Sequence, residues 1–347
     1  MPVIWLIDAY RAGERGQVRA LVDALGWPSE TKVLSYRSQV FLPHVLGQTT
    51  LRGITAEAAS ILRPPWPDLV ISCGVRNEPV CRWIRAQSGG RTRYVHVGRP
   101  WASLDSFDLV ITTPKYRVPQ RPNVLHNMLT LHSVTAQRLA AARSEWAGAF
   151  ADLPRPHFAV IAGGNSGPFT FGPKAASRLA RQASQMAREH GGSLLVSTSS
   201  RTAGAAIDAL QAGIDVPNYF YRWRPEDKAN PYLGILAWAD RLIVTGDSIA
   251  MLSEACATGK PVKIFDLGGM RGGDSGERDF RVGASLYAVL MRWFWQPLSR
   301  DITLVHQQLR ESGRATWLGE EFGTATVPAQ SDLQRAVAAV RVLLGEA

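Results

Sequence analysis

The chain is poor in cysteine. Its 347 residues include three, Cys73, Cys81 and Cys256, and none has the Cys-x-x-Cys spacing of zinc or redox motifs. Each lies among apolar or small residues, so we expect buried free thiols in a reducing compartment. The pattern argues against a disulfide framework, and we expect no metal site.

Long hydrophobic runs are also missing. The N-terminal run Val3–Ile7 is too short for the apolar region of a signal peptide. The apolar stretch Leu286–Leu298 is interrupted by Arg292 and is too short to span a bilayer. We therefore expect a soluble, cytoplasmic protein.

Acidic residues are outnumbered. Lysine and arginine total 39 against 29 acids, which gives a net charge of +10 and a pI near 9.9. Such an excess favours an anionic partner, such as nucleotide phosphates, an anionic membrane surface or nucleic acid. The sequence has no zinc-finger spacing, no RNP-type aromatic motif and no concentrated basic run, so we do not expect nucleic-acid binding. A peripheral position on the inner face of a membrane stays open, and Phe41–Leu62 is the surface that we favour for it.

Short apolar runs alternate with helical patterns along the whole chain, which predicts parallel sheets built from βαβ units. Two prolines around an arginine in Leu153–His157 indicate a stiff connector, and we place a domain boundary there. The predicted fold is α/β, with two Rossmann-like domains whose parallel sheets face each other across a cleft. We expect an N-terminal domain at 1–153, a C-terminal domain at 154–330, and a helix at 331–347 that crosses back to the first domain.

The expected elements follow the same patterns. In the first half we expect strands at Val3–Ile7, Thr31–Leu34, Leu69–Ser72, Tyr94–Val97 and Leu109–Thr112, and helices at Gly16–Leu25, Thr55–Ile61, Glu78–Ser88 and Ser133–Ala149. In the second half we expect strands at His157–Ala162, Ser193–Ser197, Asn218–Arg222 and Leu242–Val244, and helices at Pro173–His190, Asn230–Ala237 and Asp332–Leu344.

The most informative segment is Ala239–Val262, in which a buried strand, a polar turn, a helix and a Gly-x-Pro stop before another strand follow one another. Ser248 is placed to cap this helix, and the first amides, including that of Ile249, join the helix dipole in a site suited to phosphate. Glu254 follows on a surface of small and apolar residues, where its carboxylate can accept hydrogen bonds from a ribose diol. An ordinary βα unit with a solvated glutamate is the alternative for this segment taken alone.

Polar turns after the other strands supply matching chemistry, since ligands bind beyond the carboxyl ends of parallel strands. The glycine-rich turn after residue 162 offers backbone amides to a diphosphate, and Arg201 offers a bidentate charge. Tyr221 and Arg222 lie on the strand next to which a nucleobase can stack. The predicted nucleotide-binding residues are Gly163, Gly164, Asn165, Ser166, Ser199, Arg201, Thr202, Tyr221, Arg222, Asn230, Asp247, Ser248, Ile249 and Glu254.

These motifs resemble the mitochondrial fission ELM family across nearly the whole chain. The resemblance rests on Gly163–Gly167, Ser199–Thr202, Asn230–Asp240 and Val244–Val262, and in the first half on Arg11–Gln17 and two strand motifs that begin at Pro65 and Phe107. The family in turn looks like glycosyltransferases of the GT-B fold, which hold the donor in the C-terminal domain. The resemblance implies a nucleotide-diphosphate sugar as donor substrate, no cofactor, and an acceptor that is not identified, for which a lipid-linked molecule is a candidate.

The family's first turn usually carries a histidine where this chain has Glu14, and the region Thr113–Arg117 lacks the His-Asp pair that the family often has. Glu14, with Asp8 as second candidate, is the predicted catalytic base. The alternative function is a non-catalytic nucleotide- or partner-binding module. An NAD-dependent enzyme ranks low, because Gly13-x-x-Gly16 does not meet the dinucleotide-binding pattern.

Overall fold

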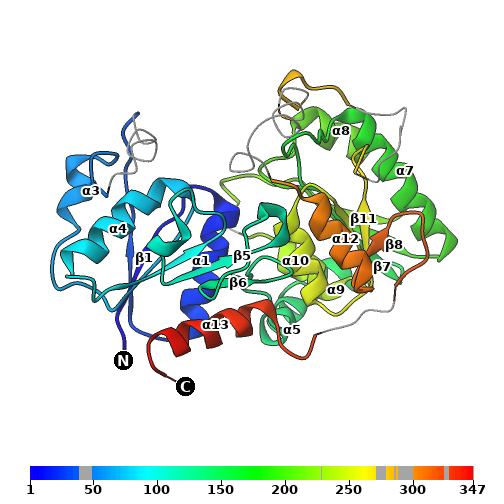
Figure 1. Cartoon of the computed structure of the whole chain (residues 1–347). Helices are drawn as coiled ribbons and strands as arrows, with labels where there is room; N and C mark the ends of the chain where they lie inside the picture. The colour runs from blue at the N-terminus through cyan, green and yellow to red at the C-terminus, as the bar shows by residue number, and fades with distance from the viewer. Residues whose placement is uncertain are drawn as a thin grey trace. The chain divides into compact units, whose positions relative to one another are not determined.

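The computed structural model describes residues 1–38, 49–227, 229–270, 279–284, 287, 300–323 and 328–346. The chain divides into two compact units (Figure 1), and each is described by itself. The first unit contains Met1–Ser133 and Ala329–Ala347, and the second contains Val134–Pro328.

The first unit is built on a six-stranded parallel sheet with the strand order β2-β1-β3-β4-β5-β6. The strands are β1 (Ile4–Ile7), β2 (Ser29–Lys32), β3 (Leu69–Cys73), β4 (Arg93–Val97), β5 (Leu109–Thr112) and β6 (Val124–His126). The helices are α1 (Ala12–Leu25), α3 (Ala56–Ser60), α4 (Glu78–Gln87) and α13 (Asp332–Leu343).

Alternating side chains of β1 enter two hydrophobic cores, one on each face of this sheet. Ile4 and Leu6 belong to a core that also contains Leu21 of α1 and Val340 of α13. Trp5 and Ile7 belong to the second core, which is filled from α3 and α4. The continuous apolar runs of the sequence are therefore explained by strands that are buried on both faces.

The C-terminal helix α13 is a part of the first unit. Ser331 begins it with a capping box, and Asp332 accepts hydrogen bonds from the backbone amides of Met128 and Leu129 at 3.2 and 2.9 Å. Val340 then packs with α1 in the core. The return of the last residues to the N-terminal part of the chain is thus fixed by polar contacts at one end and apolar contacts along the helix.

The second unit repeats the architecture, with the strand order β12-β11-β10-β7-β8-β9 and every neighbouring pair parallel. Its strands are β7 (His157–Ile161), β8 (Ser193–Ser197), β9 (Asn218–Tyr221), β10 (Arg241–Thr245), β11 (Val262–Phe265) and β12 (Thr316–Trp317). Its helices are α5 (Ala136–Glu145), α6 (Ala147–Phe150), α7 (Pro173–Glu189), α8 (Gly204–Ala212), α9 (Tyr232–Trp238), α10 (Ile249–Ala257) and α12 (Thr303–Glu311).

The predicted α/β class with two parallel sheets is confirmed, with differences of detail. The division between the units falls at Ser133/Val134, whereas the prolines had indicated residues 153/154. The reason is that α5 joins the second unit: the Trp238 indole of α9 donates to the Arg143 carbonyl at 2.7 Å, and the Arg143 guanidinium donates to the Ala237 carbonyl at 3.1 Å.

Two further differences concern strands. β2 begins and ends two residues before the predicted Thr31–Leu34, because its pairing with β1 starts at Ser29 and leaves Val33 exposed. Strands β6 and β12 were not predicted, since each is too short to show a pattern. The arrangement of the two sheets across a cleft stays a prediction.

Candidate functional site

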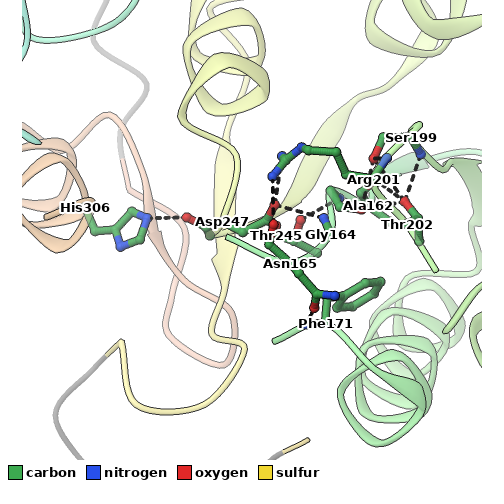
Figure 2. Close-up of polar contacts among 12 residues, drawn as sticks. Ala162, Gly164, Asn165, Phe171, Ser199, Arg201, Thr202, Thr245, Asp247 and His306 are labelled. Atoms are coloured by element: carbon green, nitrogen blue, oxygen red, sulfur yellow. Dashed lines mark hydrogen bonds and ion pairs between the residues drawn. The ribbon is translucent and has the colours of Figure 1, made fainter. Parts of the chain in front are cut away.

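Polar turns of the second unit gather at one edge of its sheet (Figure 2). Strands β10, β7 and β8 are consecutive neighbours in this sheet, and each is followed by a polar segment. Gly163–Ser166 follows β7, Ser199–Thr202 follows β8, and Asp247–Ser248 follows β10. Because the strands are parallel, these segments leave the same edge and contact one another, as the sequence predicted.

Two glycines allow the first turn to approach the other two. A Cβ atom added to Gly163 would lie 2.3 Å from Asp247 Oδ2, and one added to Gly164 would lie 2.0 Å from the Arg201 carbonyl oxygen. The amide of Gly163 donates to Thr245 Oγ1 at 2.8 Å, and that of Gly164 donates to Asp247 Oδ2 at 2.9 Å. The expectation of bare amides open to a diphosphate therefore has to be corrected for these two residues, since both amides already have acceptors in the protein.

Asp247 and Arg201 form the charged pair of the site. Arg201 Nη2 lies 2.9 Å from Asp247 Oδ2, and the Asp247 side chain is fully buried while that of Arg201 is 41% exposed. Burial raises the pKa of Asp247, and the guanidinium of Arg201 opposes that rise. Asp247 Oδ1 is buried and has no hydrogen-bond partner among the described residues. Asp247 thus orients the guanidinium of Arg201, and the exposed side of that guanidinium can bind an anion.

The remaining polar groups of these turns hold the turns together. Ser199 Oγ donates to the Gly163 carbonyl at 3.0 Å, and Thr202 Oγ1 also bonds that carbonyl. Asn165 Oδ1 accepts from the Phe171 amide at 2.9 Å, and the Ser166 amide donates to the Phe169 carbonyl. Four of the predicted ligand-binding residues therefore have structural partners, and they fix the loops on which the site depends.

Helix α10 begins at Ile249, and its N-cap Ser248 follows Asp247 directly. Ser248 occupies the N-cap position with extended backbone, but its side chain makes no capping hydrogen bond, which corrects the predicted cap. Ser248 and Ile249 are both buried. The first amides of any helix have no partner within it, so the start of α10 is a second place for an anion. Arg201 comes from the turn after β8 and is linked to this helix start by its ion pair with Asp247.

Glu254 lies on α10, and its partner is a residue that the sequence reasoning did not single out. Tyr232 Oη donates to Glu254 Oε2 at 2.5 Å. Burial raises the pKa of both side chains, and Arg138 of α5 opposes the rise for Glu254. Tyr232 is placed by the predicted helix start: its amide donates to Asn230 Oδ1 at 3.0 Å as α9 begins. The sequence signal that could have identified Tyr232 was the tyrosine in the Asn230-Pro-Tyr segment.

The two residues predicted for base stacking, Tyr221 and Arg222, do not offer an open aromatic face. Tyr221, at the end of β9, is buried, and Arg222 is exposed and paired with Asp208. Trp223 is half-buried, and its amide donates to Thr198 Oγ1 at 2.9 Å. Of these side chains, only Trp223 combines a large ring with partial exposure.

The two candidate bases lie in the first unit. Asp8 is buried and pairs with Arg15 at 2.9 Å and with Arg19 at 3.8 Å, which gives it the role of a structural turn residue. Glu14, in the first turn of α1, lies 3.8 Å from Arg11, and its Oε2 would be 3.0 Å from a Cβ atom added to Gly74. Glu14 therefore sits over the end of β3, at the carboxyl edge of the first sheet.

The sequence matches a known protein family over most of its length. The model of the Mitochondrial fission ELM1 family matches residues 12–344. The chain belongs to this family. It is 28% identical over 239 residues to the Mitochondrial fission protein ELM1 of Arabidopsis thaliana, an alignment that covers 62% of the chain and 56% of that relative. The chain thus spans little more than half the length of this plant member of the family.

Solved structures are similar to this chain over nearly its full length, at low sequence identity. The UDP-GlcNAc 2-epimerase of Neisseria meningitidis, bound to UDP-GlcNAc, is 10% identical with a TM-score of 0.49, and 99% of each chain is covered. The ADP-heptose LPS heptosyltransferase II of E. coli is 13% identical with a TM-score of 0.45, with 100% of this chain and 99% of that one covered.

No helix in the described part of the chain has the length and apolarity to cross a bilayer. No group of three or more histidine, cysteine, aspartate or glutamate residues is placed to hold a metal ion within the same ranges.

Proposed function

We propose that the chain is a GT-B-like glycosyltransferase whose second unit binds a nucleotide-diphosphate sugar and whose acceptor is not identified. The observation that carries the proposal is Arg201, which is held by the buried Asp247 and is still 41% exposed, at the edge where α10 begins. A guanidinium and a helix N-terminus side by side are suited to the two phosphates of a diphosphate.

The proposed chemistry needs few groups. A hydroxyl of the acceptor attacks the anomeric carbon of the sugar, the bond from that carbon to the diphosphate oxygen breaks, and the nucleoside diphosphate leaves with the electron pair. Arg201 and the first amides of α10 stabilise the negative charge that develops on the leaving oxygen. The proton of the acceptor hydroxyl passes to a base, for which Glu14 is our candidate because Asp8 is engaged by two arginines.

Nucleotide titration tests the proposal. Isothermal titration with UDP, ADP and GDP is expected to find at least one that binds the wild type and binds the Arg201→Gln variant about 10-fold or more weakly, because a charge-assisted contact is lost. Arg188→Gln is the matched control, since Arg188 is an exposed arginine paired with Asp215 at the end of α7. No binding of any of the three by the wild type would overturn the nucleotide site.

A second function is favoured by one observation. The ion pairs of Asp8 remove one of the two candidate bases, which supports a non-catalytic nucleotide- or partner-binding module. A donor-hydrolysis and transfer assay separates the two functions. Tight binding of a nucleotide-sugar without turnover on a panel of acceptors would favour the module.

A further inference from the structure

The first turn of α7 takes its capping group from a distant part of the chain. Gly172 occupies the N-cap position without a side chain, and Pro173 follows it. Asp279, which comes 107 residues after Gly172, supplies the acceptor. Its carboxylate accepts from the amides of Gly172, Lys174 and Ala175 at 3.0, 3.1 and 2.9 Å. The first amides of a helix have no partner within it and favour a negative charge, so this one carboxylate satisfies the start of α7.

The contact depends on the glycine at position 172. A Cβ atom added to Gly172 would lie 2.5 Å from Asp279 Cγ, which is much closer than van der Waals contact. The backbone of Gly172 is extended, with φ −110°, and other residues adopt this conformation. The approach of the carboxylate is therefore what requires a glycine here.

The same short segment also holds the turn of the connection between β7 and α7. Arg281 Nη2 donates to the Gly167 carbonyl at 2.7 Å. Phe280 and Val282, which alternate with the two charged residues, are 81% and 74% exposed. The segment thus turns its charged side chains toward the connection and its apolar ones toward solvent, the reverse of the usual preference. We call Asp279 and Arg281 the clamp.

The connection held by the clamp reaches the guanidinium of the candidate site. Asn165 Oδ1 accepts from the Phe171 amide at 2.9 Å, which fixes the two ends of the connection to each other (Figure 2). The Asn165 carbonyl accepts from Arg201 Nη1 at 3.4 Å, and Asp247 holds Arg201 Nη2 at 2.9 Å. Arg201 therefore has two supports, which are the buried carboxylate of Asp247 and the clamped connection.

We propose that Asp279 and Arg281 are positioning residues of the candidate nucleotide site, which hold the guanidinium of Arg201 in place through the connection between β7 and α7. That the anion bound there is a nucleoside diphosphate rests on the proposed function. The hold of the clamp on Arg201 does not, and it can be measured without a nucleotide.

The first test observes Arg201 directly. In ¹H–¹⁵N NMR of the full chain, the Nε–H signal of Arg201 is assigned by its loss in Arg201→Gln. Asp279→Ala and Gly172→Ala are each expected to shift this signal. Gly204→Ala is the matched control, because its Cβ, at the first residue of α8, meets nothing within 4 Å, and it should leave the signal in place.

Formate separates the clamp from a general loss of structure. This small carboxylate is expected to return the Arg201 signal toward its wild-type position in Asp279→Ala, and not in Gly172→Ala, where the new methyl group fills the place of the carboxylate. Circular dichroism checks the fold of each variant, and Asp279→Asn, which keeps an acceptor oxygen, replaces Asp279→Ala if the latter does not fold. An unchanged Arg201 signal in both folded clamp variants would overturn the proposal.

Nucleotide titration is the second test. With whichever of UDP, ADP and GDP binds the wild type, Asp279→Ala is expected to bind about 10-fold more weakly. The double variant Arg201→Gln/Asp279→Ala should bind no more weakly than Arg201→Gln alone, because the clamp acts through Arg201. Additive losses would overturn the proposal. If the wild type binds none of the three, the proposed function fails, and the NMR result alone decides whether the clamp positions Arg201.

Discussion

Removal of the Glu254 carboxylate is the perturbation that best tests the ribose role. In the structure this carboxylate shares one oxygen with Tyr232 Oη at 2.5 Å, which leaves acceptor capacity at the other oxygen. A hydrogen bond to a charged group contributes about 1–3 kcal/mol. Glu254→Ala is therefore expected to weaken nucleotide binding by that amount, which corresponds to roughly 5- to 150-fold in Kd.

Titrating both the wild type and Glu254→Ala with the nucleotide and with its 2′-deoxy analogue gives a thermodynamic cycle. If Glu254 accepts from the ribose diol, wild type should bind the ribonucleotide more tightly than its 2′-deoxy form, and the variant should lose most of that difference. Tyr232→Phe is expected to reduce the same discrimination, because the carboxylate then loses the hydroxyl that orients it. A purely structural effect would weaken both nucleotides equally.

Controls separate binding from folding. Glu254 is half-buried, so circular dichroism and the melting temperature have to accompany each titration. Glu189→Ala, which removes an exposed glutamate at the end of α7, is expected to bind like wild type. A correctly folded Glu254→Ala protein with unchanged affinity for the ribonucleotide would refute the reasoning.

Four further outcomes are expected. Glu14→Gln should keep donor affinity near wild type and lower any transfer rate about 10²-fold or more, the scale of general base catalysis; full activity would assign the base elsewhere. Gly164→Ala should destabilise the protein by about 1–3 kcal/mol in chemical unfolding, because its Cβ would meet the Arg201 carbonyl, whereas Gly16→Ala, in open space on α1, should not. Cosedimentation with anionic liposomes at low salt, fading at high salt, is expected for a chain of charge +10; no binding at low salt would contradict a peripheral membrane role. Finally, acidification from pH 6.5 to 4 should destabilise wild type more than His306→Gln.

The fold could be predicted because both sheets are buried on two faces. Runs such as Leu69–Ile71 and Leu242–Val244 are continuous in apolar residues, and such runs have few alternatives to a central parallel strand. Edge strands lack this signal: β2 is Ser-Glu-Thr-Lys, exposed at three of four positions. Its position is set by pairing with β1, which the local sequence does not encode. The favoured membrane surface, Phe41–Leu62, begins outside the described residues, as does the apolar stretch after Leu286.

The site was predictable in its location and less so in its contacts. Turns that follow neighbouring parallel strands lie at the same edge of the sheet, so the sequence could predict that Gly163, Arg201 and Asp247 lie close together. The sequence did not reveal that Asp247 would be the buried centre, since a turn aspartate is ordinarily solvated and this one is approached closely by Gly163 from the turn after another strand. Tyr232 was missed because its role also depends on a contact with a residue from another part of the chain. Its hydroxyl gains a role only through Glu254, which is 22 residues away in the chain.

The pH prediction follows from the sign of one shift. His306, on α12, is buried, and its Nε2–H donates to the Gly246 carbonyl at 2.7 Å, which leaves Nδ1 without a partner among the described residues. Burial lowers its pKa to about 4, against an ordinary value of 6.5. The unfolded chain therefore binds a proton in this window that the folded protein does not, and stability present above pH 6.5 is lost as the pH falls toward 4. The loss amounts to about 3 kcal/mol.

His306→Gln keeps an amide that can donate to the Gly246 carbonyl but cannot be protonated, so this part of the acid sensitivity should disappear. Urea unfolding of both proteins at pH 7 and pH 4.5 measures it, and His190→Gln, an exposed histidine on the same unit, should behave like wild type. Equal losses in wild type and His306→Gln would refute the assignment.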